Sequence, residues 1–140
     1  MKLDFVKDLE DLHRRAVALE EERRTKCVPR LRDNSLMPRL WAIFNEAPPA
    51  FPPRDWQRVF VLFAVCLYSP RCFLGRKMRS GVRKAISAAL GTSDDESRVS
   101  KMFYDAHDRV RLYRDFRTAV CLLFEDYTAR LEADGLLADC

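Results

Sequence analysis

The sequence of 140 residues is long enough for one domain, and a chain of this length buries about two-thirds of its surface on folding. Hydrophobic residues make up 48% and charged residues 33%, and only four residues are glycine. This composition argues against a disordered chain and against an all-β sandwich or barrel, so we expect helices with solvated faces. The formal net charge of +4 is small and identifies no partner.

Residues 3–26 are predicted to form one long amphipathic helix that no Pro or Gly interrupts. Its apolar residues recur at alternating intervals of four and three: Phe5, Leu9, Leu12, Ala16 and Leu19. The helix either packs on the rest of its own domain or forms a homodimer through Phe5, Leu9, Leu12 and Leu19. The pattern favours packing on its own domain, because a coiled coil normally needs three or four complete heptads.

A short helix and a proline-rich connector are predicted next. Ser35 suits the cap of the helix, and Pro38 suits its first turn, where a missing N–H group has little effect. The apolar residues of this helix are Leu40, Trp41, Ile43 and Phe44. Residues 48–53 contain four prolines, which predicts a stiff, extended connector to the following helix.

A central helix is predicted to begin at Pro53 and end at Tyr68. Proline suits a first helical turn, and Pro70 disfavours helical backbone at Ser69. The segment is apolar nearly all round: Trp56, Val59, Phe60, Val61, Leu62, Phe63, Val65 and Leu67. A helix with this pattern is normally buried, so we expect it at the centre of the domain.

The second half of the chain is also predicted to be helical. A helix over 76–90 ends at Gly91, and Ser93 with Glu96 has the spacing of a capping box for the helix that follows.

A last helix covers roughly 109–134, with Gly135 as its end. Whether 94–134 forms one bent helix or two stays open, because 106–108 is only a weak break. The predicted fold is therefore an all-α, single-domain bundle of five or six helices over residues 1–140, with its core in 54–135.

The residues typical of catalytic and metal sites are absent or scattered. His13 and His107 lie on different predicted helices, the five cysteines form no C-x-x-C pair, and no glycine-rich phosphate loop occurs. We therefore expect no enzyme activity, no metal or other cofactor and no small-molecule ligand. The first residues lack the apolar segment of a signal peptide, and the most apolar stretch, 59–68, is half the length of a membrane span. We expect a cytoplasmic protein without membrane contact.

Positive charge is concentrated in one part of the chain. The segment from Arg54 to Lys84 contains eight basic residues and one acidic residue, a net charge of +7 in a chain that totals +4. Such an excess is typical of a phosphate-binding face. On the predicted helix 76–90, Arg76, Arg79 and Arg83 follow helical spacing and are expected to share one face.

The segment from Arg83 to Met102 resembles the helix-turn-helix element of small bacterial and phage regulators. In that family a Leu-Gly pair ends the first helix and a Val-Ser pair lies early in the recognition helix; Leu90-Gly91 and Val99-Ser100 match them. Ser87 takes the position of the family's small residue, and the turn is about two residues longer. The resemblance implies a helix-turn-helix at 76–107 that binds double-stranded DNA.

In that arrangement, Arg98 and Lys101 would approach the major groove. Arg76, Arg79, Arg83 and Lys84 would contact phosphates, which position a protein without reading sequence. A homodimer through the N-terminal helix would suit a two-fold DNA reader. Three alternatives stay open: a helix pair with a purely structural role, an adaptor whose basic face binds an acidic protein, and an RNA-binding accessory protein.

Overall fold

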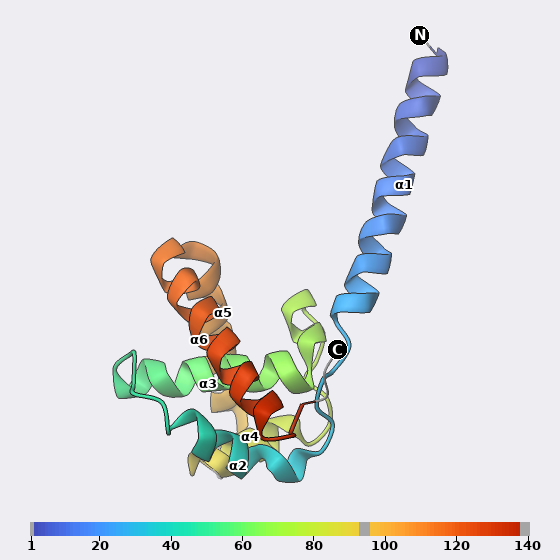
Figure 1. Ribbon diagram of the computed structural model, residues 1–140. Helices are drawn as coiled ribbons and strands as arrows, with labels where there is room; N and C mark the ends of the chain where they lie inside the picture. Colours follow the sequence, from blue (N-terminus) through green and yellow to red (C-terminus); the bar gives the residue numbers. More distant parts are fainter. Residues whose placement is uncertain (1, 93–95, 138–140) are drawn as a thin grey trace.

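The computed structural model describes residues 2–92 and 96–137, which form six α-helices and no strand (Figure 1). The α-helices are α1 (Lys2–Lys26), α2 (Met37–Phe44), α3 (Pro53–Tyr68), α4 (Val82–Leu90), α5 (Glu96–Leu112) and α6 (Arg114–Ala133). Two 3₁₀ turns, η1 (Asn34–Leu36) and η2 (Pro70–Leu74), precede α2 and follow α3. The predicted all-α class is confirmed.

Helix α3 is the centre of the body, as its apolar sequence predicts. α6 crosses α3 in Figure 1, with α2 and α4 below it, and α5 packs along α3. Ten of its sixteen residues are buried, on all sides of the helix: Trp56, Val59, Phe60, Val61, Leu62, Phe63, Ala64, Val65, Leu67 and Tyr68. The hydrophobic effect therefore requires α3 to be covered by several other helices.

Aromatic rings join α2, α3 and α6. The ring of Phe44 on α2 lies 4.1 Å from that of Trp56 and 5.7 Å from that of Phe63, both on α3, and 5.5 Å from that of Tyr127 on α6 (centroid distances). The Tyr127 hydroxyl, itself buried, donates a hydrogen bond of 2.9 Å to the Leu40 carbonyl. The hydrogen bond satisfies the one polar group that Tyr127 brings into the core.

Several predicted helix ends are confirmed. Pro53 occupies the first turn of α3. Gly91 follows α4 with φ +75°, and Gly135 lies just beyond α6 with the same φ, a left-handed conformation that glycine adopts without steric cost.

The predicted cap at Ser35 is wrong. Ser35 lies inside η1, and the carboxylate of Asp33 accepts hydrogen bonds from the Ser35 backbone N–H (3.0 Å) and hydroxyl (2.6 Å). These hydrogen bonds hold the pKa of Asp33 below its usual value. Aspartate takes the capping role because the helical chain begins one turn earlier than expected, with the 3₁₀ turn.

The second half of the chain contains two helices, and the break lies at Tyr113 rather than at 106–108. Tyr113 is extended, with φ −117° and ψ 110°, between the end of α5 and the start of α6. The helices then pack against each other as a hairpin. Leu112, expected on the stripe of the last helix, instead ends α5 and is 74% exposed.

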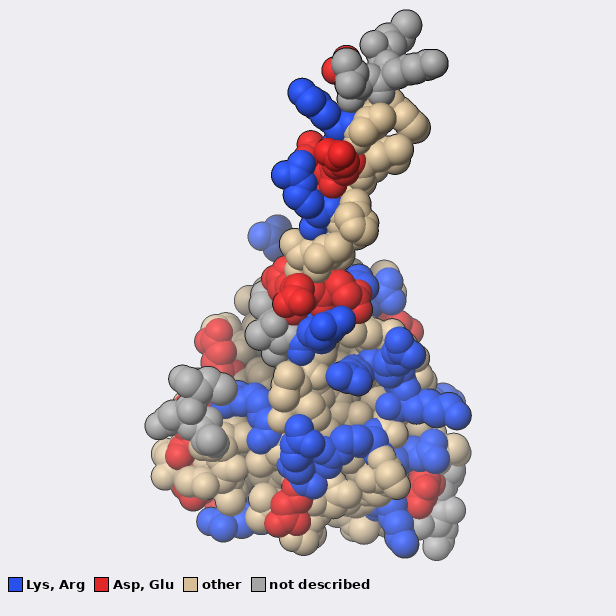
Figure 2. All heavy atoms as spheres, turned by 90° about the vertical axis from the view of Figure 1, so that its right-hand side faces the viewer, with Lys and Arg blue, Asp and Glu red and all other residues tan. Residues whose placement is uncertain are grey.

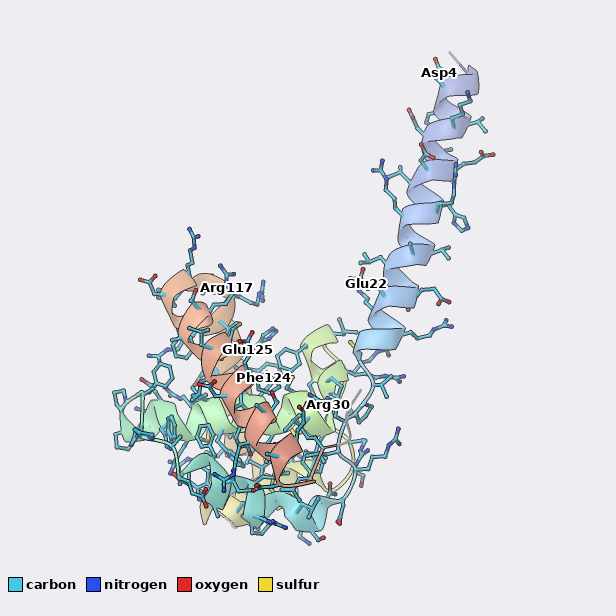
Figure 3. All side chains as sticks on the ribbon, viewed as in Figure 1. Asp4, Glu22, Arg30, Arg117, Phe124 and Glu125 are labelled. Carbon is cyan, nitrogen blue, oxygen red and sulfur yellow. The ribbon has the colours of Figure 1, made fainter. Side chains whose placement is uncertain are left out.

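The prediction that the N-terminal helix packs on its own domain is wrong. α1 projects from the body, and every side chain from Asp4 to Arg24 is exposed (Figures 1 and 3). Leu9 and Leu12 are 50% and 58% exposed. Helices α2, α4, α5 and α6 already pack around α3, so the core is covered without α1.

Tyr68 provides a test of the core at high pH. Its fully buried hydroxyl donates a hydrogen bond of 2.7 Å to the Asp33 carbonyl, and burial, followed by the charge of Asp33, raises its pKa to about 12. In the unfolded chain the phenol loses its proton near its ordinary pKa of 10, so between these values the unfolded state binds fewer protons. We expect the free energy of unfolding to fall as pH rises from 10 to 12, measured by urea denaturation.

Tyr68→Phe should weaken this fall and lower stability at pH 7 by about 1 kcal/mol, because one hydrogen bond is lost. Tyr104, which is 55% exposed, supplies the control. Tyr104→Phe should leave stability at pH 7 unchanged. If the free energy of unfolding of Tyr68→Phe depends on pH as that of the wild type does, the buried phenol of Tyr68 does not cause the loss of stability at high pH.

Candidate nucleic-acid interface

The segment between α3 and α4 carries much of the chain's positive charge and is not the helix that the sequence predicts. After η2, residues 75–81 are non-helical, and α4 begins only at Val82. Gly81, with φ +83°, takes the N-cap position of α4. Arg76 and Arg79 therefore do not share a helix face with Arg83, and that prediction is wrong.

Hydrogen bonds fix the position of this segment. Ser69, at the end of α3, accepts a hydrogen bond of 2.9 Å from the backbone N–H of Arg79 through its hydroxyl oxygen. The guanidinium of Arg79 donates to the Arg32 carbonyl at 3.0 Å, and the backbone N–H of Arg76 donates to the Arg71 carbonyl at 3.2 Å. The segment is thus held against the end of α3 and the chain that leads to η1.

Two adjoining hollows lie on either side of this segment. The first, of about 870 Å³, lies between it and the end of α1; the second, of about 640 Å³, lies between it, α4 and α5. Arg76, Lys77 and Arg79 line both hollows. We call the combined surface the basic groove; its basic residues are Arg23, Arg24, Arg32, Arg71, Arg76, Lys77, Arg79, Arg83 and Lys84.

The basic groove has a strong excess of positive charge. Among the described residues, its nine basic side chains are accompanied by two acidic ones, Glu20 and Glu96. Figure 2 shows basic side chains gathered on this face of the body, below the projecting helix. The sequence predicted a basic face, but it missed Arg23, Arg24 and Arg32, because only the fold brings the end of α1 and the chain after it to this surface.

The predicted phosphate-contacting residues lie in the basic groove, with different surroundings. Arg76 and Lys77 are exposed. Arg79 is half-buried by the contacts that hold the segment. On α4, Lys84 is exposed, and the guanidinium of Arg83 lies 3.7 Å from the Glu96 carboxylate. Glu96 therefore neutralises part of the charge of Arg83.

The two predicted base-reading residues lie on the exposed side of α5, outside the basic groove. Arg98 follows Glu96 by two residues, which places it about 200° around the helix from the groove-lining face. Lys101 lies closer, about 60° from Tyr104, which lines the second hollow. The structure thus brings Lys101 to the edge of the basic groove and leaves Arg98 further round α5.

Not every basic residue of the charged segment contributes to this face. Arg58 is 16% exposed and lies between α3 and α5, 3.3 Å from Asp55 and 3.4 Å from Asp105. Asp55 also pairs with Arg109 at 2.7 Å. These ion pairs connect two helices of the core, so Arg58 is part of the packing between them.

The helix pair that resembles a helix-turn-helix is formed by α4 and α5, which pack together. Gly91 caps the end of α4 and α5 is described from Glu96 onward, while residues 93–95 between them lie outside the part of the chain that the structure describes. Ser87 is 1% exposed, and its hydroxyl donates to the Thr92 carbonyl, which closes the end of α4. Val99 is fully buried. The predicted capping box at Ser93 lies outside the described residues.

His107 packs as an aromatic side chain. Its ring lies 5.0 Å from that of Phe73 and 5.6 Å from that of Phe103. Burial, with the charge of Arg111, holds its pKa below the usual value of 6.5. Within residues 2–92 and 96–137, no cluster of histidine, cysteine and carboxylate residues is placed to hold a metal ion, and no helix is long and apolar enough to cross a membrane.

Comparisons of the chain with protein-family models, with curated proteins and with solved structures found no significant match. The function is therefore argued from the geometry and charge of the basic groove.

Gly81 tests how the basic segment is held. A Cβ atom at Gly81 would lie 2.8 Å from the side-chain nitrogen of Asn34, whereas a Cβ at Gly75, with a similar φ of +80°, would meet no atom within 4 Å. Gly75→Ala is therefore the matched control, and it should cost about 1–2 kcal/mol for left-handed backbone alone. Gly81→Ala should cost more in urea denaturation. Equal losses would show that the contact with Asn34 is not tight.

Proposed function

We propose that the protein is a small non-catalytic DNA-binding regulator that holds the phosphate backbone of a duplex in the basic groove. The observation that carries this proposal is the joining of nine basic side chains from α1, α4 and the intervening chain on one hollowed surface. A concentrated positive surface attracts nucleic acid and releases counterions on binding. Seven of the eleven charged residues that line it are arginines, whose forked donors suit phosphate oxygens.

The residues of the basic groove divide by role in this proposal. Arg76 and Lys77 are exposed at the junction of the two hollows, where both can turn toward a phosphate. Arg79 holds the segment through the carbonyl of Arg32 and adds its charge to the surface. Glu96 reduces the contribution of Arg83. Arg76 and Lys77 are therefore the main phosphate contacts.

Base reading is assigned to the exposed side of α5. Ser100 and Tyr104 line the second hollow and connect the basic groove with the side of α5 that carries Lys101 and then Arg98. In this proposal, the major groove next to the bound backbone faces this side of α5. Arginine can make a bidentate contact with guanine there, as the resemblance to helix-turn-helix regulators implies.

An adaptor that binds an acidic protein is the second candidate. The position of Arg98 away from the basic groove favours it, because a protein partner would need only the groove. The two functions differ in their response to salt. For duplex binding, the logarithm of the binding constant falls linearly with the logarithm of the salt concentration. The slope is set by the number of phosphates that the protein contacts.

The double variant Arg76→Ala/Lys77→Ala tests the proposed phosphate contacts. Wild-type protein should bind a fluorescent duplex with steep salt dependence, measured by anisotropy at several salt concentrations. The variant should bind all duplexes more weakly, and its salt slope should be smaller by about two units, close to 0.9 for each lost contact.

The matched control is Arg114→Ala/Arg117→Ala, which removes two exposed basic residues at the start of α6 that do not line the basic groove (Arg117 is labelled in Figure 3). It should bind as the wild type does. If the wild type binds no duplex at low salt, the DNA proposal is wrong and the adaptor takes its place. Equal losses in both double variants would indicate attraction by net charge alone.

Arg98→Ala tests the assignment of base reading. A preferred sequence is first selected from a random duplex pool with the wild-type protein. The variant should then lose about 1–3 kcal/mol of its preference for that sequence over a scrambled one, while its affinity for the scrambled duplex stays the same. Lys77→Ala should show the opposite pattern, with weaker binding and unchanged preference. An unchanged preference in Arg98→Ala would remove Arg98 from the interface.

A further inference from the structure

Helix α1 presents an apolar stripe that no other described part of its own chain covers. Phe5, Leu9, Leu12 and Leu19 are each between 49% and 64% exposed. In Figure 2, uncharged side chains follow one side of the projecting helix and charged ones the other. A helix without tertiary contacts is marginally stable in water, so a stripe of this size calls for a partner.

Over residues 5–19, the stripe follows the a and d spacing of a two-stranded coiled coil for two heptads. Phe5, Leu12 and Leu19 fall at the d positions of successive heptads, and Leu9 and Ala16 fall at the a positions between them. Leucine at d is typical of parallel dimers. The next a position is Arg23, which lines the basic groove. Two paired helices would therefore separate after Leu19, because the two copies of Arg23 repel each other.

The charges beside the stripe select a second copy of this chain in parallel orientation. Arg15 occupies a g position and Glu20 the following e position. In a parallel pair each g residue faces the e residue five positions later on the other helix, so Arg15 meets Glu20 of the second copy, twice by symmetry. Asp8, also at a g position, likewise meets His13 of the second copy at the following e position. In an antiparallel pair g faces g and e faces e, and these contacts are lost.

The outer face of α1 needs no partner. Asp11 and Arg14, at the c and f positions, form an ion pair of 2.9 Å within the helix. Val17 and Ala18 are exposed on this same outer side, at b and c. The helix thus has one side suited to association and another suited to solvent.

We infer that α1 pairs with α1 of a second copy as a parallel, in-register coiled coil over residues 5–19. The two bodies then lie at the same end of the paired helices. Each body is joined to the coiled coil through residues 20–30. This arrangement places two basic grooves side by side around a two-fold axis. The dimer itself does not depend on DNA binding, and only the pairing of the grooves for one duplex rests on the proposed function.

The dimer is tested by mass in the absence of nucleic acid. Static light scattering should give twice the 16.4 kDa of the chain for the full-length protein. Leu9→Asp/Leu12→Asp should give the monomer mass, because two charges enter the stripe. Val17→Asp/Ala18→Asp adds the same charges to the outer face and should stay dimeric. A monomeric wild type, or equal dissociation in both variants, would overturn the inference.

A charge exchange tests the parallel orientation. Arg15→Glu and Glu20→Arg should each dissociate more readily on dilution than the wild type, because each places like charges opposite each other. An equimolar mixture of the two variants forms complementary contacts at both sites and should recover wild-type dissociation. A mixture that dissociates as readily as the single variants would overturn the parallel arrangement. Since no duplex is present, these results are independent of the DNA proposal.

Discussion

The fold depends on the need to cover α3 on every side. Its apolar residues surround the helix, so a single flanking helix would leave part of them in water. The aromatic residues of α2 and α6 cover one part of this surface, and Val99, Met102, Phe103 and Ala106 of α5 cover another. Four helices cover α3, and the core they form contains no side chain of α1. The projecting helix is therefore not needed to fill the core.

The end of α3 also determines where the positive charge gathers. The Leu67 carbonyl accepts hydrogen bonds from the backbone N–H groups of both Arg30 (2.9 Å) and Leu31 (3.0 Å), which ties the chain after α1 to the last turn of α3. Two residues later, Ser69 holds the basic segment through the N–H of Arg79. Two basic stretches that are far apart in the sequence therefore leave the same point of the core, and their side chains line one surface.

Local patterns in the sequence predicted the parts of the fold that depend on local physics. The all-round apolar pattern placed α3 at the centre, and Pro53, Gly91 and Gly135 marked helix ends by their backbone preferences. The start of α4 was placed too early, although Ser80-Gly81 is a turn dipeptide that could have indicated the break. The break between α5 and α6 at Tyr113 has no such signal, because neither Gly nor Pro occurs there.

The candidate site was predictable only in part, for reasons of tertiary structure. A count of charges along the chain found the basic segment, but it could not separate Arg58, which pairs with Asp55 inside the helix packing, from Arg76, which faces solvent. It also could not add Arg32, whose place in the basic groove follows from the hydrogen bonds at the end of α3. An apolar stripe likewise indicates that a helix face is buried in a contact, but it does not indicate whether the same chain or a second molecule makes that contact.

The 25 residues of α1 give the molecule an unusual hydrodynamic shape. At 1.5 Å per residue the helix is about 37 Å long, whereas a compact protein of this chain length has a radius of gyration of about 14 Å. A rod of this length adds friction with water while adding little mass. The molecule therefore diffuses more slowly than a sphere of equal mass and elutes early from a sizing column, so a single chain resembles a larger assembly to any method that measures size through friction.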